Sequence, residues 1–564
     1  MKLPFNKIDD RIQLILIGAV VGVGGGLASV VLNKSLEFGR EFLSGYMGDW
    51  FCFLFPAIGA VLAVSFLTYI ARDVGGHGVP EVIYSVTKRG GLLRLRSTFS
   101  RLIACAFTIA SGGSAGPESP VVISGASIGS NIACLFRMRD KQRIMLVAGG
   151  AAAAIASIFN APVAGIAFSL EAILGEWTST NLITIAVASA VGTEISRIFQ
   201  GNQIPFKGGP FLINDIDIIA CLGLSVFTCA SSIILMRLLR IVRSKSNKLV
   251  SSLVFRAACG GLLVGIIGLF MPEVLGEGYN AIRTVIYGHY SNGLILAGLV
   301  VLGKIVATSI TIGTGGIGGL FAPCLVIGSF LGFFYYKLLL LIAPSINWAG
   351  EAYFALLGMA GIISSVLQAP MTGIFLITEI TGGYQVLVSV VLVSVISLSL
   401  SRLFEPFSVY HQELAAKGEL LRPRTDRRIL SELNIVELID HNYYPVKSDM
   451  KLKDFIEVIK QTKYHFFPVL DPYSKRYIGI IHVDDIRAYL FDINLYDSIL
   501  VEELIDPSIP TVSLDHELHE IIDMFDYSRD ATLPVVHDGK FVGLISKSKI
   551  LDHYRKELIV EEEI

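Results

Sequence analysis

Long apolar runs alternate with short polar, glycine-rich or proline-rich breaks through the first 410 residues. Each run predicts a helix. The runs lie near residues 12–34, 51–71, 102–111, 121–136, 143–157, 161–174, 181–197, 217–236, 253–271, 294–312, 319–342, 352–366, 370–381 and 385–401. Several are shorter than the roughly 20 residues that a helix needs to cross the hydrocarbon region of a bilayer. We therefore expect a membrane region in which some helices are broken part-way across.

One stretch, residues 111–130, combines this apolar character with a single acid. Between residues 102 and 136 the only charged residue is Glu118. Nearby glycines and prolines predict irregular backbone before it and a helix after Pro120. Irregular backbone persists inside a bilayer only where it is buried in protein or lines a polar cavity, so Glu118 is a functional candidate. The alternative is that Glu118 only caps the following helix.

Composition separates this apolar part from the rest of the chain. The 564 residues are 53% hydrophobic, with a mean hydropathy of +0.63. The last 154 positions hold 48 of the 94 charged residues. This predicts a polytopic all-α membrane domain over 1–415, a linker over 416–439 and a soluble tail. The net charge of -2 argues against nucleic acid as a partner.

Two motifs recur within the membrane part. Residues 160–171, from Asn-Ala-Pro to Glu171, recur at 368–379 with an offset of 208. Residues 120–129, with their proline and two glycines, recur at 323–332 with an offset of 203. The pairing predicts two internal repeats, about 12–200 and 217–405. In membranes such repeats are often inverted, with the substrate held between them.

The tail has a duplication of its own. Phe-Pro-Val-Leu at 467–470, followed by Gly-Ile-Ile at 479–481, is echoed by residues 533–536 and 543–545. Both copies show strand-like alternation flanked by amphipathic helices. They predict two α/β modules, 440–492 and 505–557, whose sheet faces bury each other.

Four further motifs lie in the membrane part: Gly-His-Gly-Val-Pro-Glu at 76–81, Gly-Pro-Glu-Ser-Pro at 116–120, the glycine-rich residues 315–323, and Ser-Val-Tyr at 408–410. Together with this tail, they resemble the CLC family of chloride channels and proton/chloride exchangers followed by tandem cystathionine-β-synthase (CBS) domains. The first is residues 76–81, similar to the family's Gly-Ser-Gly-Ile-Pro-Glu, in which the serine contacts the central anion. Here His77 replaces that serine. A pore-facing imidazole would donate one hydrogen bond to the anion, whereas a structural histidine would face a loop carbonyl.

The second motif, residues 116–120, is similar to the family's Gly-Arg-Glu-Gly-Pro. Pro117 replaces the arginine and Ser119 the second glycine. The match places Glu118 at the family's external gating glutamate. An ionised carboxylate can occupy an anion site and block it, and a protonated one can swing aside. Its titration would therefore couple protons to anion movement.

The third and fourth motifs supply the other half of the site. Residues 315–323 resemble the family's second filter segment, whose amides at Leu320 and Phe321 would point at the anion from a helix start. Ser408-Val409-Tyr410 resembles the segment whose tyrosine closes the inner side. The resemblance gives this set of anion-binding residues: His77, Gly78, Val79, Pro117, Ser119, Gly319, Leu320, Phe321 and Tyr410.

The family's inner proton-relay glutamate has no counterpart here. Glu171 matches the glutamate before it, and Ala172 follows. Channels of the family lack this inner acid, and so do some exchangers. We interpret Glu171 as structural and bonded to backbone, because Glu379 is its repeat partner.

The CBS pair departs from the family's adenine-nucleotide pattern. Asp485 is the candidate ribose ligand in the first copy, without its usual hydroxyl partner, and Lys549 replaces the acid in the second. Adenine-nucleotide binding and a purely dimerising role both fit.

The sequence thus favours chloride transport coupled to protons, with Glu118 as gate and proton acceptor. A passive chloride channel is the alternative, and a nucleotide-sensing CBS protein with a membrane anchor is a rival from another class. An enzyme is disfavoured because the core lacks a paired carboxylate, metal cluster or nucleophile constellation. The resemblance implies a homodimer in the lipid bilayer of the cell membrane, with no essential cofactor. Basic clusters in the loops predict a cytoplasmic N-terminus and cytoplasmic CBS domains.

Overall fold

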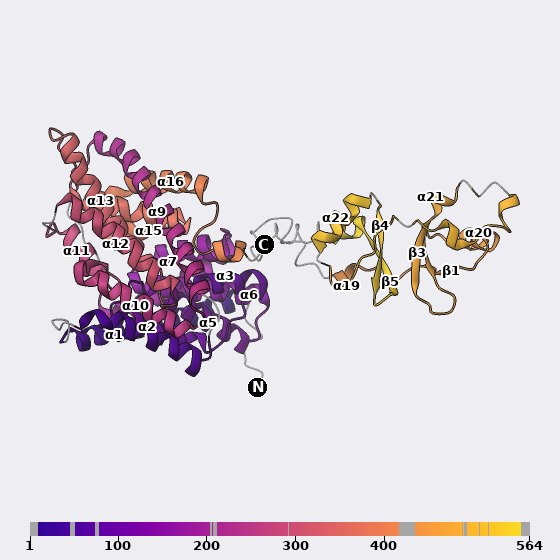
Figure 1. Cartoon of the computed structure of the whole chain (residues 1–564), viewed down its shortest axis with the longest axis horizontal. Helices are drawn as coiled ribbons and strands as arrows, with labels where there is room; N and C mark the ends of the chain where they lie inside the picture. Colours follow the sequence, from indigo (N-terminus) through magenta and orange to yellow (C-terminus); the bar gives the residue numbers. More distant parts are fainter. Residues whose placement is uncertain are drawn as a thin grey trace. The chain divides into compact units, whose positions relative to one another are not determined.

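The computed structural model describes residues 10–45, 51–73, 78–202, 206, 211–290, 293–416, 435–487, 489, 493–506, 508–516, 518–528 and 530–553. Contacts divide the chain into two compact units, Met1–Leu420 and Leu421–Ile564. In Figure 1 the first unit is a bundle of helices, and the second combines helices with short strands. Most of the predicted linker, residues 417–434, lies outside the described residues.

The first unit contains two successive sets of helices. The first set is α1 (Asp10–Ser44), α2 (Phe55–Ser65), α3 (Val79–Lys88), α4 (Ser97–Ala110), α5 (Glu118–Leu135), α6 (Asp140–Phe159), α7 (Pro162–Phe168) and α8 (Ser179–Gln200). The second set is α9 (Asp215–Leu249), α10 (Leu253–Phe270), α11 (Tyr279–Ile286), α12 (Leu294–Gly313), α13 (Phe321–Ile342), α14 (Glu351–Leu367), α15 (Pro370–Thr381) and α16 (Leu387–Phe404). A short helix, α17 (Gln412–Ala416), follows.

Every predicted apolar run contains a helix, so this part of the prediction is confirmed. Two helices run further than their apolar residues: α1 to Ser44 and α9 to Leu249. Polar residues continue a helix that has already formed, because each added residue gains a backbone hydrogen bond. The hydropathy pattern does not predict α3 or α11, since both are short and amphipathic.

The prediction of broken helices is also confirmed. Among the described residues, nine helices are long and apolar enough to cross a membrane. The shorter apolar helices are Ser97–Ala110, Pro162–Leu174, Glu351–Leu367 and Pro370–Thr381. In the second of these, α7 passes into a π-helical turn, Ser169–Leu174.

Reciprocal contacts link equivalent positions of the two halves. The Glu171 carboxylate accepts hydrogen bonds from the backbone N–H groups of Met371 and Thr372 at 3.2 and 2.9 Å, at the start of α15. Glu379 accepts from Val163 and Ala164 at 3.0 and 2.8 Å, at the start of α7. Each repeat therefore caps a helix of the other, which explains why both glutamates occur at the same place in the motif.

Within the second unit, two small sheets form separate modules. Its helices and strands are α19 (Ile435–Leu438), β1 (Val446–Lys447), α20 (Leu452–Gln461), β2 (Phe466–Leu470), β3 (Tyr477–His482), α21 (Val483–Ile486), α22 (Leu518–Ser528), β4 (Thr532–His537) and β5 (Lys540–Ser546). β1 pairs with β2 in parallel, and β2 with β3 antiparallel. β4 and β5 form an antiparallel pair in the same register: Val535 faces Gly543 as Val469 faces Gly479.

The two modules exchange contacts. The ring of Tyr477 in β3 stacks on Phe541 in β5 with 5.6 Å between centroids. The backbone N–H of Tyr477 donates to the Gly539 carbonyl at 3.1 Å. At the start of the unit, Asp440 bridges Leu544 of β5, so the segment from α19 to Asp440 packs with the second module.

Candidate functional site

Two loops, one from each repeat, meet just before α5 and α13. The N–H of Gly116 donates to the Gly319 carbonyl at 2.8 Å, and the N–H of Gly319 donates back to the Gly116 carbonyl at 2.6 Å. The bridge is antiparallel, as a two-fold relation between the repeats requires. Both helices begin two residues after it, so two helix N-termini converge on one point.

Crossed hydrogen bonds hold these loops in place. The N–H of Ser114 donates to Thr311 Oγ1 at 3.1 Å, and the N–H of Ile317 donates to Thr108 Oγ1 at 3.3 Å. The hydroxyls of Ser114 and Thr308 are 3.0 Å apart. Because each loop is bonded to the helix that precedes the other loop, the repeats fix one another's geometry.

Glu118 is the first residue of α5, and only 1% of its surface is exposed. Its Oε1 accepts a hydrogen bond from the hydroxyl of Tyr279 at 2.8 Å. Its Oε2 is buried and bonds to no described residue. A Cβ at Gly116 would collide with Oε2, and one at Gly319 would lie 3.2 Å from it. The carboxylate therefore lies against the glycine bridge, where only main chain leaves room for it.

The predicted residues of the first repeat lie beside Glu118. Pro117 precedes α5 as its N-cap. Ser119 is buried, and its Oγ accepts from the backbone N–H of Val79 at 3.2 Å. A Cβ at Gly78 would collide with Ser119 Oγ, so the start of α3 touches the start of α5. His77 lies outside the described residues.

The predicted residues of the second repeat form the opposite wall. Leu320 precedes α13 as its N-cap, and Phe321 is its first residue. Both are buried. The Phe321 ring contacts those of Phe159 and Phe168, each with 5.7 Å between centroids. These three rings enclose the N-terminus of α13 in an apolar environment, in which N–H dipoles act strongly on an anion.

Tyr410 approaches from the end of the membrane unit. It is buried, within electrostatic range of Glu118 and of Cys324 in the first turn of α13. Its segment is anchored by the N–H of Val409, which donates to the Val366 carbonyl at 3.1 Å. With the exception of His77, the structure therefore gathers the residues predicted in the membrane part around the two helix starts.

Glu171 does not belong to this cluster. It caps α15, so the interpretation of Glu171 as a structural, backbone-bonded residue is confirmed. Ala172 follows in the π-helical turn and is buried, with 3% of its surface exposed.

Comparison with known proteins identifies the family. The sequence model described as "Voltage gated chloride channel" matches residues 58–402, and the CBS domain model matches 435–492 and 501–556. The chain belongs to the CLC family. It is 30% identical over 407 residues to the "H(+)/Cl(-) exchange transporter ClcA" of Salmonella arizonae, covering 68% of this chain and 84% of that protein. The protein of the same name from Klebsiella pneumoniae is 29% identical over 407 residues, which again cover 68% of this chain and 84% of that protein.

Solved CLC structures share the fold. A slow cyanobacterial Cl-/H+ antiporter has a TM-score of 0.67 at 21% identity, over 73% of this chain and 99% of that one. A CLC-type fluoride/proton antiporter has a TM-score of 0.62 at 22% identity, over 71% and 97%. A eukaryotic CLC transporter has a TM-score of 0.61 at 17% identity and covers 95% of this CLC chain and 98% of its own.

Two residues near Glu118 escape the sequence analysis: Tyr279 and Glu277. Tyr279 donates to the Glu118 carboxylate, and Glu277 pairs with Arg40 at 2.7 Å. A signal for them exists, because Gly-Glu-Gly at 276–278 repeats the spacing of Gly-His-Gly at 76–78 with an offset of 200. This signal is weak because only the two glycines are the same in both copies, and because its offset of 200 differs from the offsets of 208 and 203 in the other two repeated motifs.

The candidate nucleotide residue lies in the other unit. Asp485 is exposed on α21, directly after β3. In the second module, the Lys549 ammonium donates to the Ile439 carbonyl at 3.1 Å. The lysine that replaces the family's acid is therefore used to hold the first residues of the CBS region.

Proposed function

We propose that this CLC protein moves chloride across the membrane in exchange for protons, with Glu118 as gate and proton acceptor. One observation carries the proposal: a buried carboxylate lies against the Gly116–Gly319 bridge, where α5 and α13 begin. Helix starts attract anions through unpaired N–H groups and the helix dipole. The names of the ClcA relatives support proton-coupled chloride exchange, and transporters rather than enzymes as the class.

The mechanism follows from competition for one site. Ionised Glu118 is itself an anion and fills the space at the bridge, so chloride is excluded. Protonation removes that charge, and with it the attraction to the helix starts, so the side chain leaves and chloride enters. The proton is released when the carboxylate returns. Main-chain dipoles bind halide without a fixed cation, which allows release as well as binding.

The test is proton movement driven by chloride. Purified protein is reconstituted into liposomes loaded with high chloride, and external pH is followed after dilution into low chloride. We expect proton uptake against the pH gradient in the wild type, and none in Glu118→Gln, which still conducts chloride. Glu41→Gln, the same change at an exposed position of α1, should behave as wild type. Wild-type chloride flux without proton movement contradicts the proposal.

A passive channel is the second candidate, and Ala172 favours it. The position after Glu171 holds no acid, so no inner side chain at that place can accept a proton. Water in the protein would have to carry protons past it. The same liposome experiment separates the two, because a channel dissipates a chloride gradient without pumping protons.

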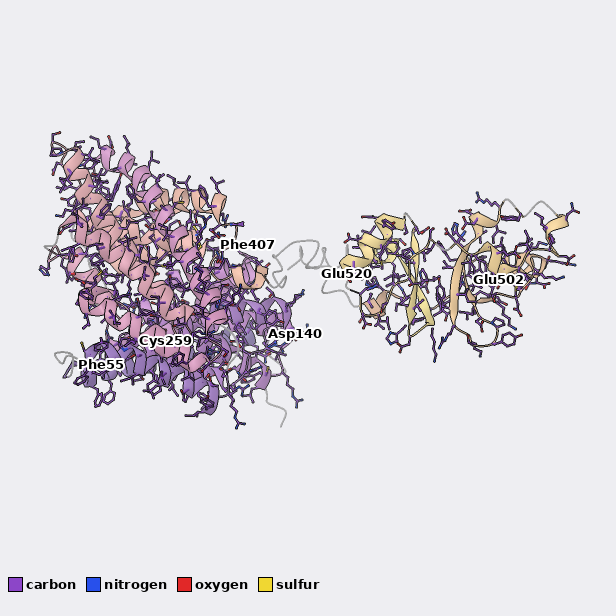
Figure 2. The ribbon with its side chains drawn as sticks, in the orientation of Figure 1. Phe55, Asp140, Cys259, Phe407, Glu502 and Glu520 are labelled. Carbon is purple, nitrogen blue, oxygen red and sulfur yellow. The ribbon has the colours of Figure 1, made fainter. Side chains whose placement is uncertain are left out.

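We propose a homodimer inserted with the N-terminus and CBS domains in the cytoplasm. Apolar residues on α7, α8 and α15 remain exposed, among them Val163, Ile183 and Met371. Glu171, in the π-helical turn after α7, and Glu379, on α15, are half-buried, and a partner subunit would shield them from lipid. In Figure 2, Asp140, the first residue of α6 and directly after the loop with Arg137 and Arg139, lies toward the same side of the unit as Phe407. Basic loops are enriched on the cytoplasmic side of membrane proteins, which supports a cytoplasmic location for this side. The mass of the protein in nanodiscs tests the dimer.

We propose that the CBS pair binds an adenine nucleotide with Asp485 on the ribose. The support is its exposed position directly after a glycine-containing strand. Titration of the full chain with a fluorescent ATP analogue tests this, and Asp485→Asn should weaken binding at least tenfold. Equal binding by the variant contradicts the role of Asp485.

A further inference from the structure

A large cavity lies close to Glu118, on the side of Tyr279. Its volume is about 740 Å³. It lies between α1, α2, α10 and α11, and its lining includes Arg40, Phe55, Glu277 and Tyr279. Phe55 lies away from Asp140 and Phe407 in Figure 2. Tyr279 is half-buried, lines the cavity and reaches Glu118 with its hydroxyl, so it is the wall between the two.

The loop that carries Tyr279 is the counterpart, in the second repeat, of the loop before α3 in the first repeat. Residues 276–279, Gly-Glu-Gly-Tyr, follow residues 76–79, Gly-His-Gly-Val, with an offset of 200. Gly78 and Gly278 share a left-handed backbone, with φ of 74° and 82°. α3 begins at Val79 and α11 begins at Tyr279. Val79 contacts Ser119 and Tyr279 contacts Glu118, so the two loops hold adjacent residues of α5.

The loop that carries Tyr279, residues 276–279, is held by several contacts. Lys304 is fully buried, and its ammonium donates to the carbonyls of Val274 and Gly276 at 3.0 and 2.8 Å. The carboxylate of Glu277, 8% exposed, pairs with Arg40 at 2.7 Å. The N–H of Gly276 donates to the Gly112 carbonyl at 3.1 Å. These contacts fix the start of α11, so the tyrosine hydroxyl has a defined position relative to the gate.

We propose that Tyr279 is a positioning residue that latches the ionised Glu118 side chain in its site, and thereby sets the pH at which transport begins. The inference rests on the proposed function. A phenol hydrogen bond to a carboxylate is charge-assisted and stronger than one to a neutral acid. Tyr279 therefore holds the blocking form of the gate and loosens when Glu118 takes up a proton.

Other titratable groups around the gate belong to the same environment. Those within electrostatic range of Glu118 are Cys105, Glu277, Tyr279, Cys324 and Tyr410. Arg40, Arg283 and Lys304 lie within range of Glu277. Among the hydrogen bonds between side chains of the described residues, the Tyr279 hydroxyl supplies the one to Glu118. Removing it changes that bond and leaves the surrounding charges in place.

The first test compares chloride flux against pH in liposomes for wild type, Tyr279→Phe and Tyr290→Phe. Phenylalanine keeps the ring and removes only the hydroxyl. Tyr290 lines the same cavity and packs edge-on against Phe330 and Phe333, which makes it a matched control. We expect the pH of half-maximal flux to rise by about one unit in Tyr279→Phe, a tenfold change in proton occupancy, and to stay unchanged in Tyr290→Phe. An unshifted Tyr279→Phe profile overturns the inference.

A second comparison separates a latch from a packing role. In a Glu118→Ala background the latch has nothing to hold, so adding Tyr279→Phe should leave chloride flux within twofold. If Tyr279→Phe instead lowers flux equally in both backgrounds, Tyr279 acts through packing and the inference is wrong. Failure of the wild type to pump protons counts against the proposed function itself, whereas these comparisons of chloride flux count against Tyr279 alone.

Discussion

At the scale of single residues, the proposed gate Glu118 depends on the absence of side chains at Gly116 and Gly319. Because Gly116 and Gly319 have no side chain, the Glu118 carboxylate, or an anion in its place, has room to lie against the bridge. Their N–H groups are used in the bridge itself. Attraction for an anion must therefore come from the free N–H groups in the first turns of α5 and α13.

A methyl group at Gly319 should obstruct that space. The Cβ of Gly319→Ala would lie 3.2 Å from Glu118 Oε2 and 2.9 Å from the backbone nitrogen of Ser119. We expect chloride flux in liposomes to fall at least tenfold while the protein still folds.

Gly383→Ala is the matched control. No atom lies within 4 Å of a Cβ at that position. Equal fluxes from the two variants would show that the bridge is not on the anion path.

Another residue, Glu405, couples the end of α16 to α9. Its carboxylate bonds to Arg237 and Arg240 at 2.8 and 2.6 Å, and its carbonyl accepts from Gln368 at 2.7 Å. Burial raises the pKa of Glu405, but the hydrogen bonds from the two arginines outweigh it and hold that pKa below its ordinary value. The contact lies five residues before Tyr410, so it also anchors the segment that brings Tyr410 to the site.

Because the pKa of Glu405 is lowered in the folded protein, its contribution to the free energy of unfolding decreases toward acid pH. The stabilisation by Glu405 is present above the ordinary carboxyl pKa and is lost as pH falls through the lowered one. We expect Glu405→Gln to reduce the free energy of unfolding by about 1–3 kcal/mol at neutral pH. Thermal unfolding in detergent should show the gap between wild type and variant closing between about pH 5 and pH 2. A gap that widens toward acid contradicts this assignment.

At the scale of elements, the two repeats stabilise each other through Glu171 and Glu379. Each carboxylate accepts two backbone hydrogen bonds at the first turn of the other repeat's short helix. Short helices gain most from such caps, because a large share of their N–H groups lacks a partner within the helix. α7 and α15 begin with proline, which fits the first turn of a helix.

Replacing either capping glutamate by a neutral residue should therefore lower the stability of the protein and leave the coupling of protons to chloride unchanged. We expect Glu171→Gln and Glu379→Gln each to reduce the free energy of unfolding by about 1–2 kcal/mol, measured by thermal unfolding in detergent. Proton coupling per chloride should stay at the wild-type ratio in both. Loss of coupling in Glu171→Gln at unchanged stability would make Glu171 a proton relay and contradict the structural role.

Much of the fold at this scale is predictable from the sequence. Proline and glycine mark the helix starts, and hydropathy marks the helices, so the broken helices and duplicated motifs follow from local patterns. The cross-repeat contacts do not. Nothing in the residues around Glu171 indicates that its partners lie 200 residues away, and the same holds for the Gly116–Gly319 bridge.

The candidate site likewise contains one residue that the sequence predicts and one that it does not. Glu118 is predictable because a lone acid in an apolar, glycine-rich run is costly to hold at membrane depth and is therefore a mark of function. Tyr279 is not, because a tyrosine at the start of a short amphipathic helix is ordinary. Only its hydrogen bond to Glu118 in three dimensions reveals it.

At the scale of the whole molecule, duplication is the organising feature. The membrane unit is two repeats that meet at the Gly116–Gly319 bridge, the proposed anion site, and the CBS unit is two modules that share strand register. In both units a residue from the earlier or later part of the sequence contacts the other part: Glu379 of the second repeat caps α7 of the first. Asp440, which precedes the first CBS sheet, pairs with β5 of the second. Neither repeat of the membrane unit could form the site alone, since the site is their junction.

The central claim is that ionised Glu118 and a halide compete for one place at this junction. Anomalous diffraction from crystals soaked in bromide tests it directly. We predict no bromide at the Gly116–Gly319 bridge in the wild type at neutral pH, and a bromide peak there in Glu118→Ala. A variant without bromide at the bridge, or a wild type with bromide there while the Glu118 carboxylate stays in place, would contradict the account.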